Sequence, residues 1–291
     1  MLYDSLMDGK TSNVFVPLVA LEQQGPDRFV APASPDKGER LYGGQFLAQC
    51  VLAAERTAND DRAPHSLHAY FMRPGDADVA LEITVARLRD GRGFSTREVV
   101  AEQQGKPLFR MLVSLQVAET SPCYAGRAMP SVPPPEQVNS TYDDFTLTQT
   151  GGSDWHGAAR PMDIRYVNPP TAPRGTPVTE SQLMWMRIPE PLPDDPAIHR
   201  AALAYLSDST LVDNVMLPLG LRWQDEDFLG TSLDHAMWLH RFARADEWLL
   251  FEQRVEATGN GRGLASGRFF TSSGELAATC LQEGLMRWAE R

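Results

Sequence analysis

Hydrophobic residues recur on nearly every side of two segments of the chain, and this pattern predicts two buried helices. The first segment runs from Gln45 to Thr57, and the second runs from His199 to about Val215. A surface helix would show one apolar stripe, whereas a helix that is apolar all round is enclosed by protein. Each of the two helices should therefore lie in the interior of its half of the chain.

Each predicted helix is followed by four strand-like segments, connected by turns that contain glycine, as in β-hairpins. In the first half these are Ser66–Met72, Val79–Arg89, Phe94–Gln103 and Pro107–Val117. In the second half they are Ser232–His240, Trp248–Ala257, Leu264–Thr271 and Leu276–Arg287. Shorter strands are predicted ahead of the helices, at Arg28–Ala31, Ile164–Val167 and Gln182–Ile188. This order predicts an α+β fold, with a long antiparallel meander wrapped around one helix in each half.

The two halves also repeat one another in sequence. His68-Ala69 aligns with His235-Ala236, 167 residues later, and Gly-Arg-Gly turns begin at Gly91 and at Gly261. A period of this size indicates a duplicated domain, because the repeats of solenoid proteins span only about 20–50 residues. We predict an N-terminal domain of residues 12–120 and a C-terminal domain of residues 161–291. The proline-rich residues 121–160 are predicted to be a linker long enough to cross one face of the molecule.

Composition and charge exclude several classes of function. The 291 residues carry a net charge of −11, which argues against nucleic acid as a partner, since proteins that bind it display basic surfaces. No apolar run approaches the roughly 18 residues that a membrane span requires, and the acidic N-terminus does not resemble a signal peptide. The three cysteines are too widely spaced for a zinc motif and suit a reducing compartment. We therefore expect a cytoplasmic protein without a membrane span or a bound metal.

Common catalytic motifs are missing from the chain. The segment 230–234, which comes nearest to a nucleophile elbow, ends in Asp, and Gly9-Lys10-Thr11 lacks the earlier glycine of a P-loop. The glycine-rich segment 259–263 lies between two predicted strands, which favours a hairpin turn. No two histidines have the helical spacing of metal ligands. Any chemistry must therefore come from single polar residues.

Three polar residues stand in apolar surroundings in the second half. Asp208 follows the apolar run of the second helix, where a carboxylate is costly unless it is paired or used. It could be a general base with a raised pKa, or it could belong to a local helix cap. Gln282 on its apolar strand could hold a water or polarise a carbonyl, or it could be an ordinary strand residue. Ser232, at the start of a strand, could hold a water or be structural.

The repeated histidines His68 and His235 likewise allow two interpretations. They could form a functional pair, or they could pack at symmetry-related positions of the sheet.

Longer blocks of the sequence resemble the type II, TesB-like acyl-CoA thioesterases, a double-hotdog family. The similarity extends from about Leu41 to Arg287. The matching blocks are Leu41–Gln45, His65–Asp76, Tyr205–Asp208, Ser232–Trp238, Glu247–Leu250 and Gln282–Arg287. The resemblance implies a double hotdog, in which two antiparallel sheets each wrap around a buried helix and join as one continuous sheet.

The resemblance also implies an activity and a set of residues. In this family an Asp, a Thr or Ser, and a Gln surround the attacking water, and these positions fall on Asp208, Ser232 and Gln282. The implied reaction hydrolyses a fatty acyl-CoA to a free fatty acid and coenzyme A, without a metal or redox cofactor. Asp208 would act as general base or orient the water, while the other two residues hold it. Backbone N–H groups at Gly43-Gly44 are candidate donors to the carbonyl oxygen.

The first half lacks the full set of three residues. Gln45 lies 23 residues before His68, and Asp208 lies 27 residues before His235, so Gln45 is near the position that corresponds to Asp208. When the two repeats are aligned, Ser114 corresponds to Gln282. We expect the first half to be structural or to form one wall of the site.

Two alternatives to the thioesterase remain open. One is a non-catalytic acyl-CoA-binding hotdog, against which the presence of Asp208 argues. The other is a hotdog enoyl-CoA hydratase, which would pair an Asp with a His a few residues later, whereas no His follows Asp208 until His235. Because hotdog sheets present an open face or edge, we also expect a homo-oligomer, either a dimer or a tetramer.

Overall fold

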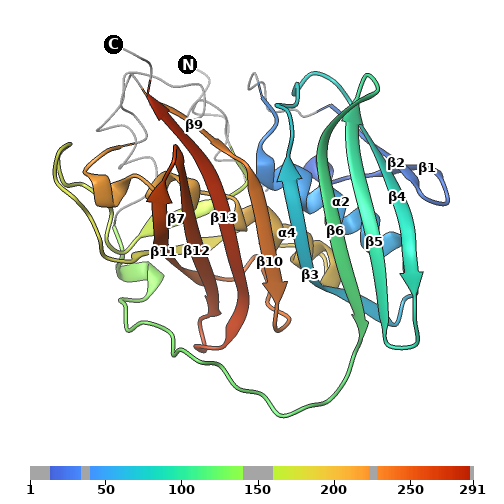
Figure 1. The fold of residues 1–291 in the computed structure, drawn as a ribbon. Helices are drawn as coiled ribbons and strands as arrows, with labels where there is room; N and C mark the ends of the chain where they lie inside the picture. The colour runs from blue at the N-terminus through green and yellow to red at the C-terminus, as the bar shows by residue number, and fades with distance from the viewer. Residues whose placement is uncertain (1–13, 34–39, 140–159, 223–227, 289–291) are drawn as a thin grey trace, which may run out of the picture.

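A single antiparallel sheet forms most of the molecule. The computed structural model describes residues 14–33, 40–139, 160–222 and 228–288, and within these ranges 13 strands belong to one sheet (Figure 1). The strand order is β1-β2-β4-β5-β6-β3-β10-β13-β12-β11-β8-β7, and β9 pairs with the end of β13. This continuous sheet agrees with the predicted double hotdog.

The strands fall into two sets that follow the two halves of the chain. The first set comprises β1 (Glu22–Gly25), β2 (Arg28–Ala31), β3 (Arg62–Phe71), β4 (Leu81–Asp90), β5 (Phe94–Gln103) and β6 (Lys106–Val117). The second set comprises β7 (Asp163–Tyr166), β8 (Gln182–Arg187), β9 (Phe228–Ser232), β10 (Asp234–Leu239), β11 (Leu249–Gly259), β12 (Arg262–Thr271) and β13 (Leu276–Trp288). The predicted strands are confirmed to within a few residues at their ends. β1 and β9 were not predicted.

The repeated sequence block forms the seam between the two halves. Strands β3 and β10 pair in antiparallel fashion, with His68 opposite Ala236 and Ala69 opposite His235. Each copy of the His-Ala dipeptide therefore pairs with the other copy, as a local two-fold axis between equivalent strands requires. The seam joins the two meanders into one sheet.

Two long helices lie on the same face of this sheet (Figure 1). They are α2 (Gly43–Arg56) and α4 (Pro196–Ser207), and a short α1 (Phe15–Leu18) precedes them. The start of α2 meets the end of α4, where the Tyr42 hydroxyl donates to the Tyr205 carbonyl at 3.0 Å. The end of α2 meets the start of α4, where Arg200 pairs with Glu55. The helices therefore run antiparallel.

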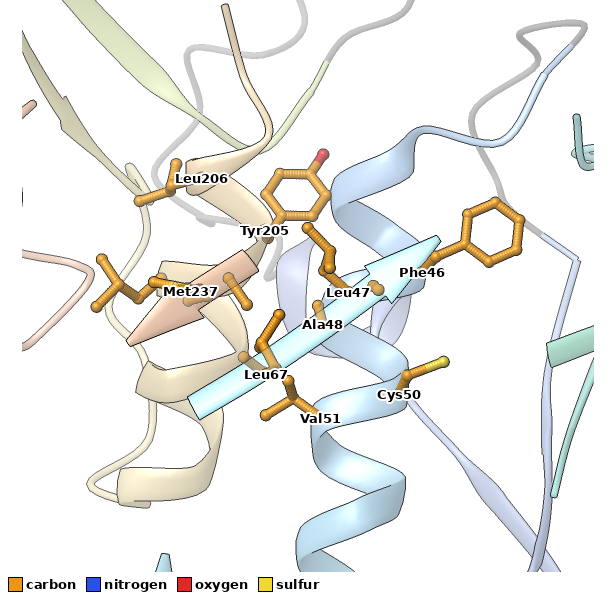
Figure 2. Packing of buried hydrophobic residues seen from close by; sticks show 14 of the residues in the cluster. Phe46, Leu47, Ala48, Cys50, Val51, Leu67, Tyr205, Leu206 and Met237 are labelled. Atoms are coloured by element: carbon orange, nitrogen blue, oxygen red, sulfur yellow. The ribbon is translucent and has the colours of Figure 1, made fainter. Parts of the chain in front are cut away.

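Apolar side chains from both helices and from the seam strands form the core. Leu67 of β3 and Met237 of β10 point toward the helices, where they meet Leu47, Val51 and other buried residues (Figure 2). The helices are buried on nearly all sides, as the all-round apolar pattern predicts.

The predicted bounds of the second helix were wrong at both ends. Helix α4 begins at Pro196, because the Asp195 carboxylate caps it by accepting from the Ala197 N–H at 2.9 Å. It ends at Ser207, and Thr210 then takes a left-handed conformation with φ of 64°. Two 3₁₀ turns follow, η3 (Val212–Asn214) and η4 (Leu217–Leu219). Leu211, Val212 and Val215 in this region are also buried, so the hydrophobic pattern did not reveal the end of the helix.

The described part of the predicted linker crosses the outer face of the second half. A 3₁₀ turn, η1 (Pro135–Gln137), lies within it. The Trp185 indole donates to the Pro133 carbonyl at 2.9 Å, and Arg165 donates to the Pro135 carbonyl at 2.7 Å. Residues 140–159 of this linker, and residues 12 and 13 of the predicted first domain, lie outside the described residues.

No helix among the described residues is long and apolar enough to cross a membrane.

Glycine at position 267 allows close packing within the second meander. An added Cβ there would lie 2.3 Å from a ring carbon of Phe251 and 2.8 Å from the Cys280 sulfur. Phe251 in turn stacks on Phe269, with ring centroids 3.9 Å apart. We predict that Gly267→Ala lowers the free energy of unfolding by about 1–3 kcal/mol, because the stacked rings must move.

Urea unfolding monitored by circular dichroism measures this change. Gly93→Ala is the matched control, since nothing lies within 4 Å of a Cβ at that position, and its change should stay within about 0.5 kcal/mol. Equal stability of the two variants would contradict the packing argument.

Candidate active site

The structure brings Asp208, Ser232 and Gln282 together from three separate segments. The Gln282 carboxamide nitrogen donates to Asp208 Oδ1 at 2.6 Å and to Ser232 Oγ at 2.8 Å. Asp208 directly follows α4, Ser232 is the last residue of β9, and Gln282 lies within β13. One amide therefore links a carboxylate to a hydroxyl, and the three predicted residues form one cluster.

Gln282 is positioned by the alternation of β13. Its side chain is fully buried on the inner face of the sheet, between Cys280 and Gly284 on the same face. A Cβ at Gly284 would lie 2.3 Å from a methyl group of Val212, so glycine there lets η3 pack directly against the strand. The buried amide thus lies beneath the loop that follows Asp208.

Ser232 is positioned by an irregularity between β9 and β10. Ser232 pairs with Gly284, whereas Ala236 pairs with Leu281. The segment from 232 to 236 is therefore one residue longer than the segment of β13 that it faces. The Leu233 N–H donates to the Glu283 carbonyl at 2.9 Å, and the Glu283 N–H donates to Asp234 Oδ1 at 2.7 Å. Ser232 therefore ends one strand rather than beginning the next, which corrects its predicted position.

Asp208 faces the other half of the molecule at the start of α2. The Gly44 N–H hydrogen-bonds to the carboxylate, and the partial positive charge of the helix N-terminus also favours an anion there. A Cβ at Gly43 would lie 2.6 Å from Asp208 Oδ2, so only glycine permits this approach. The first half therefore forms one side of the site.

The cap interpretation of Asp208 is correct for its backbone but not for its side chain. Asp208 is the C-cap residue of α4, yet its carboxylate bonds with Gln282 and Gly44, which are distant in sequence. The backbone after it is fixed by Gln253, whose amide donates to the Ser209 carbonyl at 3.2 Å and to Thr210 Oγ1 at 2.8 Å. These bonds hold the loop that carries Asp208.

The surroundings of Asp208 raise its pKa to about 6. Burial is the main cause, and it is opposed by the hydrogen bonds from Gln282 and Gly44 and by the positive charge of Arg160. Burial and the charge of Asp208 also raise the pKa of Asp213, in η3, to about 7. The Asp208 carboxylate is thus mostly ionised at neutral pH and basic enough to accept a proton.

Sequence reasoning missed Arg160 and Asp213. The Arg160 guanidinium stacks over the Tyr42 ring at 4.5 Å and contributes positive charge to the site. Its sequence neighbourhood carried no signal for this role. Asp213 interrupts an apolar run, as Asp208 does, so the same criterion could have identified it.

Among the described residues of the first half, no equivalent cluster is found. Gln45 lies in the first turn of α2, so it does not correspond to Asp208, and the C-cap residue of α2 is Thr57. The number of residues before the repeated histidine was a poor guide to equivalent positions, because the second half has η3, η4 and β9 between α4 and β10. At the matching place the buried Arg97 donates to Thr57 Oγ1 and to its carbonyl, both at 3.1 Å. Ser114, the predicted counterpart of Gln282, instead lies 2.8 Å from His65 Nε2.

The two repeated histidines lie on opposite faces of the sheet. His68 is exposed and packs edge-on against Trp238, with ring centroids 5.2 Å apart. His235 is buried on the inner face. They therefore do not form a functional pair, and the packing interpretation of His68 holds.

Within the described ranges, no group of three or more His, Cys, Asp or Glu residues is placed to hold a metal ion.

Comparison with known proteins gives consistent results for both halves. Residues 159–285 match a family model described as acyl-CoA thioesterase, and residues 30–116 match one described as its N-terminal domain. The chain is 35% identical to human acyl-coenzyme A thioesterase 8 over 260 residues, which cover 86% of this chain and 81% of that protein.

Two solved structures support the fold. The acyl-CoA thioesterase II TesB2 of Mycobacterium marinum is 35% identical, with a TM-score of 0.78 over 95% of this chain and 98% of that one. A hot dog protein of unknown function from Alicyclobacillus acidocaldarius is 20% identical, with a TM-score of 0.75 over 96% of this chain and 100% of that one. The second likeness shows the fold alone, and the predicted double hotdog is confirmed.

The raised pKa of Asp208 has a consequence for stability. Because the folded protein holds the proton up to about pH 6, ionisation of this group disfavours folding as the pH rises from about 4 through 6. Asp208→Asn removes that ionisation while keeping the shape. We predict that the variant melts at a higher temperature than the wild type at pH 8, and that the difference narrows at pH 4.5. Thermal unfolding at the two pH values measures this, and a difference independent of pH would contradict the assigned pKa.

Proposed function

Because the chain belongs to the acyl-CoA thioesterase family, we propose that Asp208, Ser232 and Gln282 activate the water that hydrolyses the thioester. The protein is a thioester hydrolase that acts on acyl-CoA. The observation that carries the proposal is the Gln282 amide, which joins a buried carboxylate and a hydroxyl at the start of a helix. In this proposal the attacking water is held by the Asp208 carboxylate, as acceptor, and by the Ser232 hydroxyl.

The proposed reaction starts with proton transfer to Asp208. Its carboxylate accepts a proton from the water as the water oxygen attacks the thioester carbonyl carbon. Ser232 and Gln282 hold the water and the carboxylate in position, which lowers the entropic part of the barrier. The tetrahedral intermediate then collapses, the carbon–sulfur bond breaks, and the proton on Asp208 is available to the departing coenzyme A thiolate. The products are a free fatty acid and coenzyme A.

The negative charge that develops on the carbonyl oxygen needs hydrogen-bond donors. The Gly44 N–H already bonds to Asp208, and the Gln45 N–H bonds to the Tyr42 carbonyl at 3.0 Å. We therefore assign the oxyanion contact to the Gly43 N–H, at the first position of α2. The same helix N-terminus would then stabilise both the base and the developing oxyanion.

Several wider features complete the proposal. The substrate is a fatty acyl-CoA, and the enzyme acts in fatty acid metabolism in the cytoplasm, to which the free thiols of Cys50, Cys123 and Cys280 are suited. It assembles as a homo-oligomer, for which the exposed Tyr70 and Leu112 on the outer sheet face supply apolar area. The division into domains of residues 12–120 and 161–291 is likewise proposed.

A thiol-release assay with saturated acyl-CoAs of graded length tests the role of Asp208. We predict that Asp208→Asn lowers kcat by about 10²-fold or more, the range for a positioned acid–base group. Asp61→Asn, at an exposed surface position, is the matched control and should keep wild-type activity. Equal rates for Asp208→Asn and the wild type would refute the assignment. No turnover by the wild type on any acyl-CoA would favour the binding protein instead.

The pH dependence of kcat/KM tests the same role independently. Only the ionised carboxylate can accept the proton, so kcat/KM should rise with pH through about 6 and level off above it. Asp213 titrates nearby, so the rise is expected to be broad in the wild type and sharper in Asp213→Asn. If the rise near pH 6 disappears in Asp213→Asn, the essential base is not Asp208.

A further inference from the structure

The orientation of the Gln282 carboxamide decides whether its nitrogen or its oxygen faces Asp208 and Ser232. A carboxamide has a donor end and an acceptor end of nearly the same shape. In the structure the donor end, Nε2, faces both Asp208 and Ser232. The acceptor end, Oε1, points the other way, is buried, and has no hydrogen-bond partner in the described residues.

His235 lies beside Gln282 on the neighbouring strand. The register that pairs Ala236 with Leu281 brings the preceding and following residues, His235 and Gln282, side by side on adjacent strands. Both side chains are buried on the inner face, and the His235 ring interacts with the Gln282 side chain. The ring nitrogen Nδ1 is itself buried and, within the described residues, unpartnered.

The other ring nitrogen is next to the end of α4. Nε2 of His235 lies 3.0 Å from the hydroxyl of Ser207, which in the structure donates to the Ala204 carbonyl at 2.8 Å. Burial lowers the pKa of His235 to about 4, and the interaction with Gln282 opposes this only in part. The ring is therefore neutral at neutral pH and carries one proton, on either Nδ1 or Nε2.

The two tautomers leave different groups unpaired. With the proton on Nε2, the ring donates to the Ser207 hydroxyl, and both Nδ1 and Gln282 Oε1 remain buried acceptors without a donor. With the proton on Nδ1, the ring can donate to Gln282 Oε1, and the Ser207 hydroxyl turns from the Ala204 carbonyl to donate to Nε2, so that Oε1 and both ring nitrogens are paired. Because an unpaired buried polar group is costly, the second tautomer is favoured.

We propose that His235 is a positioning residue, which donates from Nδ1 to Gln282 Oε1 and so holds the Gln282 amide with its nitrogen toward Asp208 and Ser232. This inference deepens the proposed function and rests on it. The chain of donors runs from Ser207 through His235 and Gln282 to Asp208 and Ser232. His235 contacts neither the water nor the substrate.

The proposed reaction requires the Gln282 amide to be held in one orientation. Once Asp208 has taken up the proton, its O–H group could donate to an amide oxygen, and the Gln282 amide could then turn around. In the turned state Oε1 would face Asp208 and would resist its return to the carboxylate form. A donor at Oε1 keeps the amide in one orientation throughout the cycle.

Two substitutions of His235 separate this role from a general packing role. The amide nitrogen of Asn takes the place of Nδ1, and the amide nitrogen of Gln takes the place of Nε2. His235→Asn therefore keeps the donor to Gln282, whereas His235→Gln keeps only the contact with Ser207. Both variants place a neutral amide in the same buried site.

The two variants are compared in kcat, KM and pH profile, using the full chain and the acyl-CoA that the wild type hydrolyses fastest. We expect His235→Asn to stay within about threefold of the wild-type kcat, and His235→Gln to fall by about tenfold or more, the factor for one lost hydrogen bond. KM should change little in either variant.

The acid side of the pH profile gives a second readout. The hydrogen bond from Gln282 lowers the pKa of Asp208, so its loss in His235→Gln should move the rise in kcat/KM to higher pH. In His235→Asn the rise should stay in place. The other groups that affect Asp208 or titrate around it are unchanged in both variants: Arg160, Asp213, Tyr42 and Cys280.

Ser207→Ala is the further variant if either His235 variant does not fold. It removes the donor to Nε2, so the ring loses its preference for the tautomer that serves Gln282, and kcat should fall by a few-fold with KM unchanged.

Equal kcat values for His235→Asn and His235→Gln, or a lower value for His235→Asn, would refute the positioning role of His235. An unchanged kcat in Ser207→Ala would do the same where the His235 variants cannot be compared. Asp208→Asn is measured alongside, because full activity of that variant would refute the proposed function itself and not only the role of His235.

Discussion

The site depends on the balance of forces on one buried carboxylate. Burial disfavours the ionised form of Asp208, while the Gln282 amide, the Gly44 N–H and the charge of Arg160 favour it. If burial acted alone, the group would hold its proton and could not act as a base at neutral pH. With the donors in place, its pKa comes to about 6, near the working pH, where a general base is both ionised and basic. The surrounding structure can be understood as the support for these donors.

Gene duplication explains how that support arises from both halves. The antiparallel arrangement of α2 and α4 places the start of one helix against the end of the other, so two equivalent corners exist in the molecule. At one corner, Gly263 of β12 and Gly284 of β13 leave room for Val215 and Val212, in and beside η3. At the other corner, Arg97 fills the space and bonds to Thr57. The duplicated fold therefore carries the proposed site at one corner, and the other corner is closed by the buried Arg97 side chain.

The sequence predicted the elements of the fold better than their ends. Periodicity located both helices and most strands, because burial on one or all sides leaves a regular pattern of apolar residues. It did not locate the end of α4 at Ser207, since Val212 and Val215, in and just after the first 3₁₀ turn, are buried as they would be in a helix. The resemblance to a family, rather than periodicity, selected Asp208, Ser232 and Gln282, which the structure brings together. The roles of Arg160 and Gly44 could not be predicted, because Arg160 lies 48 residues and Gly44 lies 164 residues from Asp208 in the sequence, and only the fold brings them together.

The central claim is that water attacks the thioester directly, with Asp208 as the base and Ser232 only as a holder of that water. Rapid-quench intact-mass spectrometry of the wild-type enzyme during a single turnover tests this claim most directly. The account predicts that product forms without any population of acylated protein at any time point. An acyl adduct that appears and decays on the time scale of turnover, on Ser232 or on Asp208, would contradict it.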